Sequence, residues 1–275
     1  MTSVKIVLDS SADLTAMEGI PFSFAPLKIV TQEEQFIDDA DLDVEAMAEH
    51  LYKYRGRSTT SCPNPEDWLA AFGDGEEILC ITITSGISGT YNSARIAKQQ
   101  YEEAFPHRKV ELVDSLSAGP EIALMAEKAR EWILEGRTLE QIAADLKSYR
   151  TELLFALESL QNFANNGRVS KLAAKTAGVL GIRAVGRASD HGTLELLEKV
   201  RGESRTLSTL IKLLEEKGYR GGKARITHCG NPSAAEQLAM LIKEHFKDAT
   251  VTVADCRGLC AYYAERGGML LGFEA

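Results

Sequence analysis

One stretch, residues 78–94, constrains the fold of this chain more than any other. Its sequence is ILCITITSGISGTYNSA. The apolar residues 78–81 and the β-branched residues 82–84 are typical of a strand buried on both faces of a parallel sheet. The turn 85–90, with two glycines and three hydroxyl side chains, stops the strand. Residues 91–97 then predict the first turns of a helix.

A strand, a glycine-rich turn and a helix in this order form a cradle for an anion. The first amide groups of a helix have no partner within the helix, and the helix dipole is positive there. Glycine lets the backbone approach the ligand closely. Ligands of open α/β sheets bind at this carboxyl edge of the strands. An ordinary helix N-cap after a tight loop gives the same pattern, so this stretch alone leaves both interpretations open.

The rest of the chain shows two different patterns of predicted secondary structure. Up to about residue 150 strands alternate with helices, which predicts a parallel sheet covered by helices in an α/β/α domain. Beyond that point short strands are joined by turns such as Asp190-His191-Gly192, which predicts a mixed sheet in an α+β domain. We therefore expect an α/β protein of two domains, residues 1–150 and 151–275.

The composition argues against several classes of function. The formal net charge is −9, whereas proteins that bind nucleic acids or anionic membranes are usually basic. No stretch approaches the roughly 18 apolar residues that span a bilayer, and the first ten residues are unlike a signal peptide. The five cysteines are scattered, which indicates reduced thiols in a cytoplasmic protein.

The sequence predicts no metal site. Cys256 and Cys260 have a Cys-x3-Cys spacing, but no second pair and no nearby histidine accompany them. The acidic stretch 38–43 lacks the glycine that a calcium loop needs, so we expect it to cap a helix that begins near Val44.

Polar side chains follow several of the predicted strands. Asp9-Ser10 and Asp114-Ser115 each end a strand, which suggests two loops that meet at one edge of the sheet. Residues 58–61, STTS, form another polar run, placed before Pro63 and the next helix. Turn and helix capping explain such residues as well as ligand binding does, so they are candidates only.

Eight segments match a known family in their order and spacing. They are KIVLDSSADL, FAPLKI with Asp38 downstream, TTSCPNP, ITITSGISGTYNSA, VDSLSAG, LQNFANNGRVSKL, LEKVRG and THCGNP. By these motifs the chain resembles the DegV-like fatty-acid-binding proteins, the acyl-binding subunits of bacterial fatty acid kinases. The resemblance extends over essentially the whole chain.

The resemblance implies that one long-chain fatty acid is buried between the two domains. Its carboxylate would meet Thr60 and Ser88, with Ser61 and the amide of Gly89 close by. A partner kinase subunit, using ATP and magnesium, would convert the carboxylate to an acyl phosphate for phospholipid metabolism. The chain itself would be a non-catalytic, monomeric binding protein, with a bound fatty acid and no cofactor.

The same resemblance singles out further positions. Arg168 and Arg201 match arginines of the family, and they would dock the kinase or hold the transferred phosphate, because guanidinium groups suit phosphate and carboxylate. Surface ion pairs with Glu158 or Glu198 are the alternative. His228 would lie near the domain interface, or it is a satisfied core residue. The small apolar run 173–182 would line the acyl tunnel, or it serves close helix packing.

The chain departs from the family beside the expected carboxylate. Many relatives carry a His-x-Gly-Pro-Gly turn whose histidine reaches the ligand, whereas Glu265 occupies the histidine position here. An ionised Glu265 beside a fatty carboxylate would repel it. Either Glu265 points away, or Arg266 or a tyrosine takes over the role.

Two other functions are alternatives to fatty-acid binding. A serine hydrolase or acyltransferase would use Ser85 or Ser88, but the turn lacks the Gly-x-Ser-x-Gly spacing and no histidine has an evident orienting acid. A protein that binds a small phosphate compound would use the same helix start.

Overall fold

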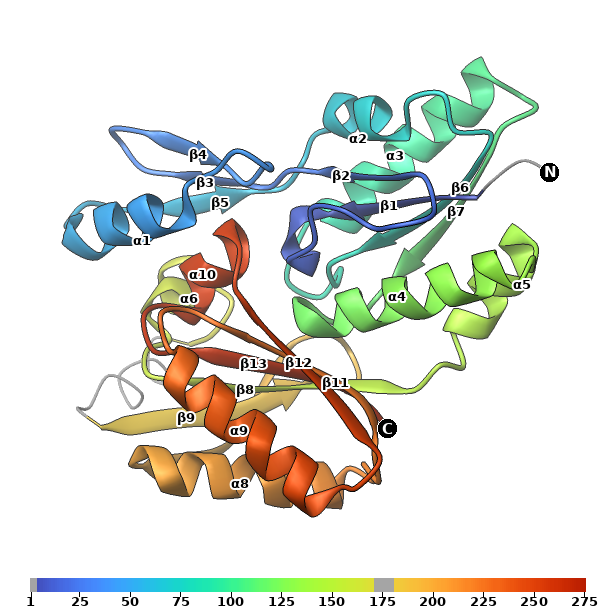
Figure 1. The fold of residues 1–275 in the computed structure, drawn as a ribbon. Coiled ribbons are helices and arrows are strands. Elements are labelled where there is room, and N and C mark those ends of the chain that lie inside the picture. The colour runs from blue at the N-terminus through green and yellow to red at the C-terminus, as the bar shows by residue number, and fades with distance from the viewer. Residues whose placement is uncertain (1–3, 171–180) are drawn as a thin grey trace.

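The N-terminal half of the molecule is built on a parallel sheet. The computed structural model describes residues 4–170 and 181–275. Four strands pair in the order β2-β1-β6-β7, and every neighbouring pair is parallel (Figure 1). They are β1 (Lys5–Asp9), β2 (Phe22–Ala25), β6 (Glu77–Thr82) and β7 (Lys109–Asp114). The predicted parallel α/β arrangement is therefore confirmed.

Helices cover both faces of this sheet, which explains the continuous apolar strands. On one face Val7, Ile78 and Cys80 pack with α2 (Pro65–Phe72) and α3 (Thr90–Ala104). On the other face Ile6 and Leu79 pack with α4 (Pro120–Leu134) and α5 (Leu139–Leu146). Successive residues of a strand point to opposite faces, so a sheet covered on both sides needs apolar residues at every position.

A small antiparallel sheet next to α10 (Gly258–Ala264) was not predicted. Its strands β3 (Lys28–Val30), β4 (Gln35–Ile37) and β5 (Thr59–Ser61) pair in the order β4-β3-β5, and α1 (Val44–Lys53) lies beside them. The sequence indicated an extended segment over residues 22–30 with an edge or bend at Pro26, and the structure has two strands there, on either side of Pro26. Residues 58–61, for which helix capping was one open interpretation, contain strand β5 instead. The chain leaves the parallel sheet before Pro26, whose ring nitrogen cannot donate to a ladder.

The C-terminal half is a six-stranded mixed sheet, as predicted. Its order is β10-β9-β8-β13-β11-β12, and only the β11–β12 pair is parallel. Helices α8 (Glu203–Glu216) and α9 (Pro232–His245) cover one face (Figure 1). The strands are β8 (Thr151–Leu157), β9 (Ile182–Ala188), β10 (Leu194–Arg201), β11 (Gly222–His228), β12 (Ala249–Asp255) and β13 (Met269–Glu274).

Helix α4 lies between the two sheets and contacts both of them (Figure 1). Its first turn carries Glu121, a buried acid whose carboxylate accepts hydrogen bonds from the hydroxyls of Ser117 and Thr151. The strand pairing changes from parallel to antiparallel between β7 and β8, near the predicted boundary at residue 150. The division into domains 1–150 and 151–275 stays a prediction.

Two short elements complete the part of the molecule next to α10. They are the 3-10 helix η1 (Ser10–Ala12) and α6 (Gln161–Asn165). Across residues 4–170 and 181–275, no helix is both long and apolar enough to cross a membrane. The same residues contain no cluster of three or more His, Cys, Asp or Glu side chains that could hold a metal ion.

Two buried carboxylates from the N-terminal half cap the start of α10. Asp38 accepts hydrogen bonds from the amides of Gly258 and Leu259, each 2.9 Å long, and Asp13 accepts one from the Arg257 amide at 2.9 Å. Of the acidic stretch 38–43, Asp43 caps α1 as predicted, because its side chain accepts from Ala46. The prediction was wrong for Asp38, which caps a helix more than two hundred residues away in the sequence.

Replacing Asp13 should change how stability depends on pH. Burial raises the pKa of Asp13 to about 7, so the folded protein binds a proton that the unfolded chain releases near its ordinary value of 3.8. This group therefore lowers the free energy of unfolding as the pH rises from about 4 to about 7. Asparagine tolerates the left-handed φ of 56° and still accepts the Arg257 hydrogen bond. We expect Asp13→Asn to reduce the fall in the free energy of unfolding between about pH 4 and pH 7 by a few kcal/mol, since one pKa unit is worth about 1.4 kcal/mol.

Urea unfolding across this pH range checks the expectation, with the exposed Asp41→Asn as a matched control. An identical pH slope in wild type and Asp13→Asn would contradict it.

Candidate functional site

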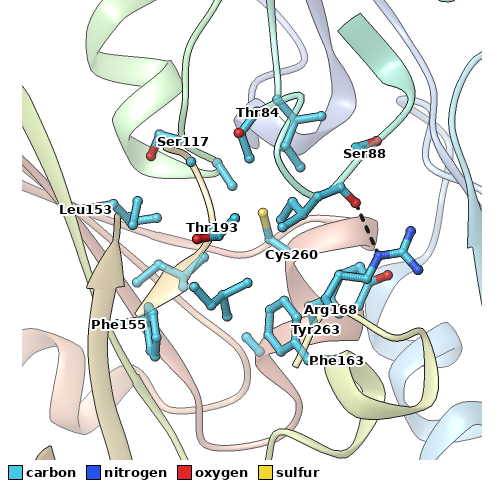
Figure 2. A pocket seen from close by; sticks show the side chains of 18 of the residues that line it. Thr84, Ser88, Ser117, Leu153, Phe155, Phe163, Arg168, Thr193, Cys260 and Tyr263 are labelled. Carbon is cyan, nitrogen blue, oxygen red and sulfur yellow. Dashed lines mark hydrogen bonds between the residues drawn. The ribbon is translucent and has the colours of Figure 1, made fainter. Parts of the chain in front are cut away.

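An apolar pocket lies between the two sheets. It is bounded by the carboxyl edge of the parallel sheet and by the face of the mixed sheet that α8 and α9 leave uncovered (Figure 2). The space between its atoms amounts to about 810 Å³, open mouth included. Its walls come from the turn after β6, from β8, from the β9–β10 hairpin, and from α6 and α10.

Strand β8 shows how the local sequence makes the wall. Leu153, Phe155 and Leu157 line the pocket, whereas Leu154 and Ala156 between them pack with the core beneath α8 and α9. Alternate residues of a strand point to opposite faces, so one apolar strand serves the pocket and the core together.

The turn after β6 is fixed by the two Asp-Ser strand ends. Asp9 accepts a hydrogen bond from the amide of Ile83 at 2.6 Å, and Asp114 accepts one from the amide of Ser85 at 3.1 Å. Burial raises the pKa of Asp9 to about 6. The two loops meet at one edge, as the sequence suggested, and their carboxylates hold the backbone that carries Ser88.

Ser88 lines the pocket, and its hydroxyl is paired with a second hydroxyl. Its Oγ lies 2.7 Å from Thr90 Oγ1 and accepts a hydrogen bond from the Thr90 amide at 3.3 Å. Gly89, the N-cap residue of α3, is exposed and does not line the pocket. Thr90 is fully buried in the first turn of α3.

Thr60 reaches the pocket through a tyrosine. Thr60 itself does not line the pocket, but Tyr263 does, and Thr60 Oγ1 lies 2.8 Å from Tyr263 Oη. Burial raises the pKa of Tyr263, so its hydroxyl keeps its proton at neutral pH. Ser61, the next residue, is exposed on β5. The structure thus brings Thr60 and Ser88 to one pocket, but it does not bring Ser61 there.

Arg168 lies at the same end of the pocket as Ser88 (Figure 2). Its Nε donates to the carbonyl of Ile87 at 3.2 Å and its Nη1 to the carbonyl of Asn166 at 2.5 Å. Glu158, a proposed partner of Arg168, is bound by Arg183 at 2.8 Å instead. Arg201 is exposed at the end of β10 and does not line the pocket.

Glu265 is turned towards α6 rather than into the pocket. Its carboxylate accepts hydrogen bonds from the hydroxyl of Ser159 at 2.9 Å and from the amide of Asn162 at 3.1 Å. Burial raises the pKa of Glu265. Arg266 is exposed, and its guanidinium lies 6.0 Å from the ring centroid of Tyr52.

His228 is buried at the end of β11, where its Nδ1 accepts a hydrogen bond from the Asn231 amide at 3.4 Å. It does not line the pocket. Most of the apolar run 173–182 lies outside the described residues, so its predicted place along the acyl tunnel stays a prediction.

Two features of the pocket were not predicted from the sequence. One is the contact between Tyr263 and Thr60, 203 positions away in the chain, although a tyrosine was among the groups expected to take over the role of the family's histidine. The β9–β10 hairpin is the other, and it supplies Gly192, Thr193 and Leu194 to the wall. The Asp190-His191-Gly192 turn was recognised, but nothing in the sequence shows what it packs against.

Comparison with known proteins identifies the family. The family model described as "Uncharacterised protein, DegV family" matches residues 3–273. This chain belongs to the DegV family. A DegV domain-containing protein of Streptococcus pyogenes serotype M1 is 40% identical over 276 residues, which cover 98% of this chain and 99% of the relative. The resemblance inferred from the eight motifs is therefore confirmed.

Two solved DegV structures of similar sequence contain fatty acids. A DegV family protein from Eubacterium eligens, loaded with heptadecanoic acid, has a TM-score of 0.97 and 45% identity to this chain. The Streptococcus pneumoniae fatty acid kinase (Fak) B3 protein, loaded with linoleic acid, has a TM-score of 0.96 and 38% identity. Each comparison covers 99% of both chains. The predicted combination of a parallel and a mixed sheet is thus the fold of this family.

Gly192 should be needed where the hairpin packs against the end of β6. A Cβ at Gly192 would lie 1.9 Å from Thr84 Oγ1 and 3.0 Å from the Leu116 carbonyl oxygen. Gly136 has a similar positive φ but open space around it, so Gly136→Ala measures the backbone cost alone, about 1–2 kcal/mol. We expect Gly192→Ala to lower the free energy of unfolding by at least about 1 kcal/mol more, because overpacking adds to that cost.

Denaturant unfolding of the two variants provides the measurement. Equal losses at the two glycines would mean that the hairpin moves away from Thr84 without cost.

Proposed function

We propose that this DegV protein binds a long-chain fatty acid in the pocket between its sheets and presents the carboxylate to a partner kinase. The observation that supports this most directly is the polarity of the pocket. Apolar atoms form most of its surface, although Thr84, Ser117, Thr193, Arg168 and Arg187 are also among the lining residues. The two hydroxyl pairs Ser88–Thr90 and Thr60–Tyr263 lie at its surface or directly behind it. A molecule with a long apolar chain and one small polar end matches this distribution.

The energies are consistent with such a ligand. Burying a methylene gains about 0.8 kcal/mol, so a chain of about 14–16 carbons gains on the order of 10 kcal/mol before the costs of binding. The carboxylate loses its water, and hydrogen bonds to it of about 1.5–3 kcal/mol each offset that loss. The apolar chain therefore supplies the affinity, and the hydroxyl groups fix the orientation.

We propose that the carboxylate lies at the end of the pocket that holds Ser88 and, behind Tyr263, Thr60, the two residues that the resemblance assigned to it; Ser61 and the amide of Gly89 are its further candidate contacts. Gly89, at the start of α3, and Ser61, on β5, are exposed, and neither is among the residues that line the pocket. No cofactor is required for binding alone. ATP and magnesium would belong to the kinase subunit, and the present chain would hold the substrate without catalysing the transfer.

Arg168 and Arg201 are the proposed contacts with the kinase or with the phosphate in transit. Arg168 has two backbone carbonyls as hydrogen-bond partners and no carboxylate among the residues described, so its charge is not neutralised by an ion pair. The S. pneumoniae relative is a fatty acid kinase B3 protein, which supports a kinase partner for this chain.

The pocket gives less support to the alternatives. Ser88 has Thr90 as its hydroxyl partner, and no histidine is among the described residues that line the pocket. A serine nucleophile needs a base within hydrogen-bond reach. A small phosphate compound would leave the apolar walls of the pocket in contact with water.

Removing the hydroxyl groups of Ser88 and Thr60 together should weaken lipid binding. We expect the doubly substituted Ser88→Ala, Thr60→Val protein to bind long-chain fatty acid at least about tenfold more weakly, since one charge-assisted hydrogen bond is worth about 1.5–3 kcal/mol. Mass spectrometry of lipid extracted from the denatured proteins measures the bound load, and titration of lipid-free protein with palmitate measures affinity.

Ser208→Ala, in the exposed face of α8, is the matched control and should retain the wild-type load. A lipid-free wild-type protein that also fails to bind added palmitate or oleate would disprove the proposed function.

A further inference from the structure

Tyr263 lines the pocket and its hydroxyl is paired with Thr60, and the role inferred for it below rests on the proposed function. It lies near the end of α10, and its ring stacks on Phe163 with centroids 4.5 Å apart and an interplanar angle of 27°. Figure 2 shows the ring beside Phe163 at the Arg168 end of the pocket. Its hydroxyl therefore has a fixed place next to the apolar cavity.

The hydroxyl groups of Thr60 and Tyr263 have one hydrogen left over for a ligand. Thr60 and Tyr263 form one hydrogen bond of 2.8 Å, which uses one of their two hydroxyl hydrogens. The other hydrogen is available for a ligand. Either hydroxyl can donate in this contact. Because Tyr263 lines the pocket and Thr60 does not, we infer the arrangement in which Thr60 donates and the Tyr263 hydrogen is left for a ligand.

In the Ser88–Thr90 pair, too, a hydroxyl that lines the pocket is paired with one behind it. Thr90 is buried behind Ser88, and both its amide and its hydroxyl lie within hydrogen-bond distance of Ser88 Oγ. When Thr90 donates both hydrogens, the two lone pairs of the Ser88 oxygen are occupied and its own hydrogen points elsewhere. Ser88, like Tyr263, then presents one free O–H group to the pocket.

The environment favours an anion between these two groups. Arg168 lines the same end of the pocket, and its charge acts to lower the pKa of the neighbouring Tyr263, whereas burial acts more strongly to raise it. The phenol stays protonated and is a donor. Glu265, which would oppose an anion, is directed towards Ser159 and Asn162.

We propose that Tyr263 and Ser88 are the two direct hydrogen-bond donors to the fatty-acid carboxylate, and that Thr60 is a positioning residue that acts through Tyr263. Each donor binds one oxygen of the carboxylate. The preferred headgroup is a carboxylate rather than an ester or an alcohol, since only the carboxylate offers two strong acceptors.

Affinities of lipid-free protein for palmitate test this assignment. Tyr263→Phe removes only the hydroxyl and should raise the Kd by about 10- to 100-fold, the range expected for one charge-assisted hydrogen bond. Thr60→Val should weaken binding in the wild-type background but have no further effect in the Tyr263→Phe background. Tyr149→Phe, which removes the hydroxyl bound to Glu274, is the matched control and should leave the Kd unchanged.

A second measurement separates a lost donor from a disturbed fold. The carboxyl resonance of bound [1-13C]palmitate reports the ionisation of the ligand directly. Removing a donor to the carboxylate should move the pH midpoint of this resonance upwards in Tyr263→Phe and leave it unchanged in Tyr149→Phe.

The outcomes distinguish this inference from the proposed function. If wild type binds palmitate and Tyr263→Phe binds it equally well, Tyr263 is not a ligand residue and the inference is wrong. If Thr60→Val costs the same affinity with and without the Tyr263 hydroxyl, Thr60 contacts the carboxylate itself, and the inference is again wrong. If wild type binds no palmitate, the proposed function fails.

Discussion

The carboxylates of Asp13 and Asp38 bind the first amide groups of α10, and the pocket depends on this contact. The start of a helix carries free amide hydrogens and the positive end of the dipole, so acidic side chains stabilise it. The capping acids belong to the N-terminal half of the chain and α10 to the C-terminal half. One half therefore determines where the other places the pocket residues of α10, which are Leu259, Cys260, Tyr263 and Ala264.

The same kind of contact organises the opposite wall of the pocket. Asp9 and Asp114 accept hydrogen bonds from the amides of Ile83 and Ser85, and so they hold the turn that ends with Ser88. Burial acts to raise the pKa of Asp9, Asp13 and Asp38, and hydrogen bonds to each carboxylate act in the opposite direction. These acidic anchors hold both sides of the cavity without adding polar atoms of their own to its lining.

The features that the sequence predicted depend on residues close together in the chain, and the features that it missed depend on contacts between residues far apart in the chain. The strand, turn and helix over residues 78–94 were predicted because their signals are local: an apolar run, two glycines and a helix start. Strand β5 was missed because its ladder is formed with β3, about thirty residues earlier. Asp38 was predicted to cap the helix that follows it in the sequence, because no residue near it in the sequence points to α10, the helix that it caps in the structure. The importance of Tyr263 depends on Thr60, a contact that only the folded chain creates.

A carboxylate that is held by neutral hydroxyl groups suits a substrate that must still react. A bidentate ion pair with arginine would stabilise the carboxylate more strongly, and it would occupy the lone pairs that attack a phosphoryl group. Arg168 is instead directed at the carbonyls of Ile87 and Asn166, so its positive charge stays at this end of the pocket without a carboxylate partner among the residues described. Under the proposed function the binding energy comes from the apolar chain, which does not change during phosphoryl transfer. A carboxylate oxygen would then exchange a hydroxyl hydrogen bond for a bond to the γ-phosphorus of ATP as ADP leaves, and headgroup contacts of this strength permit that exchange.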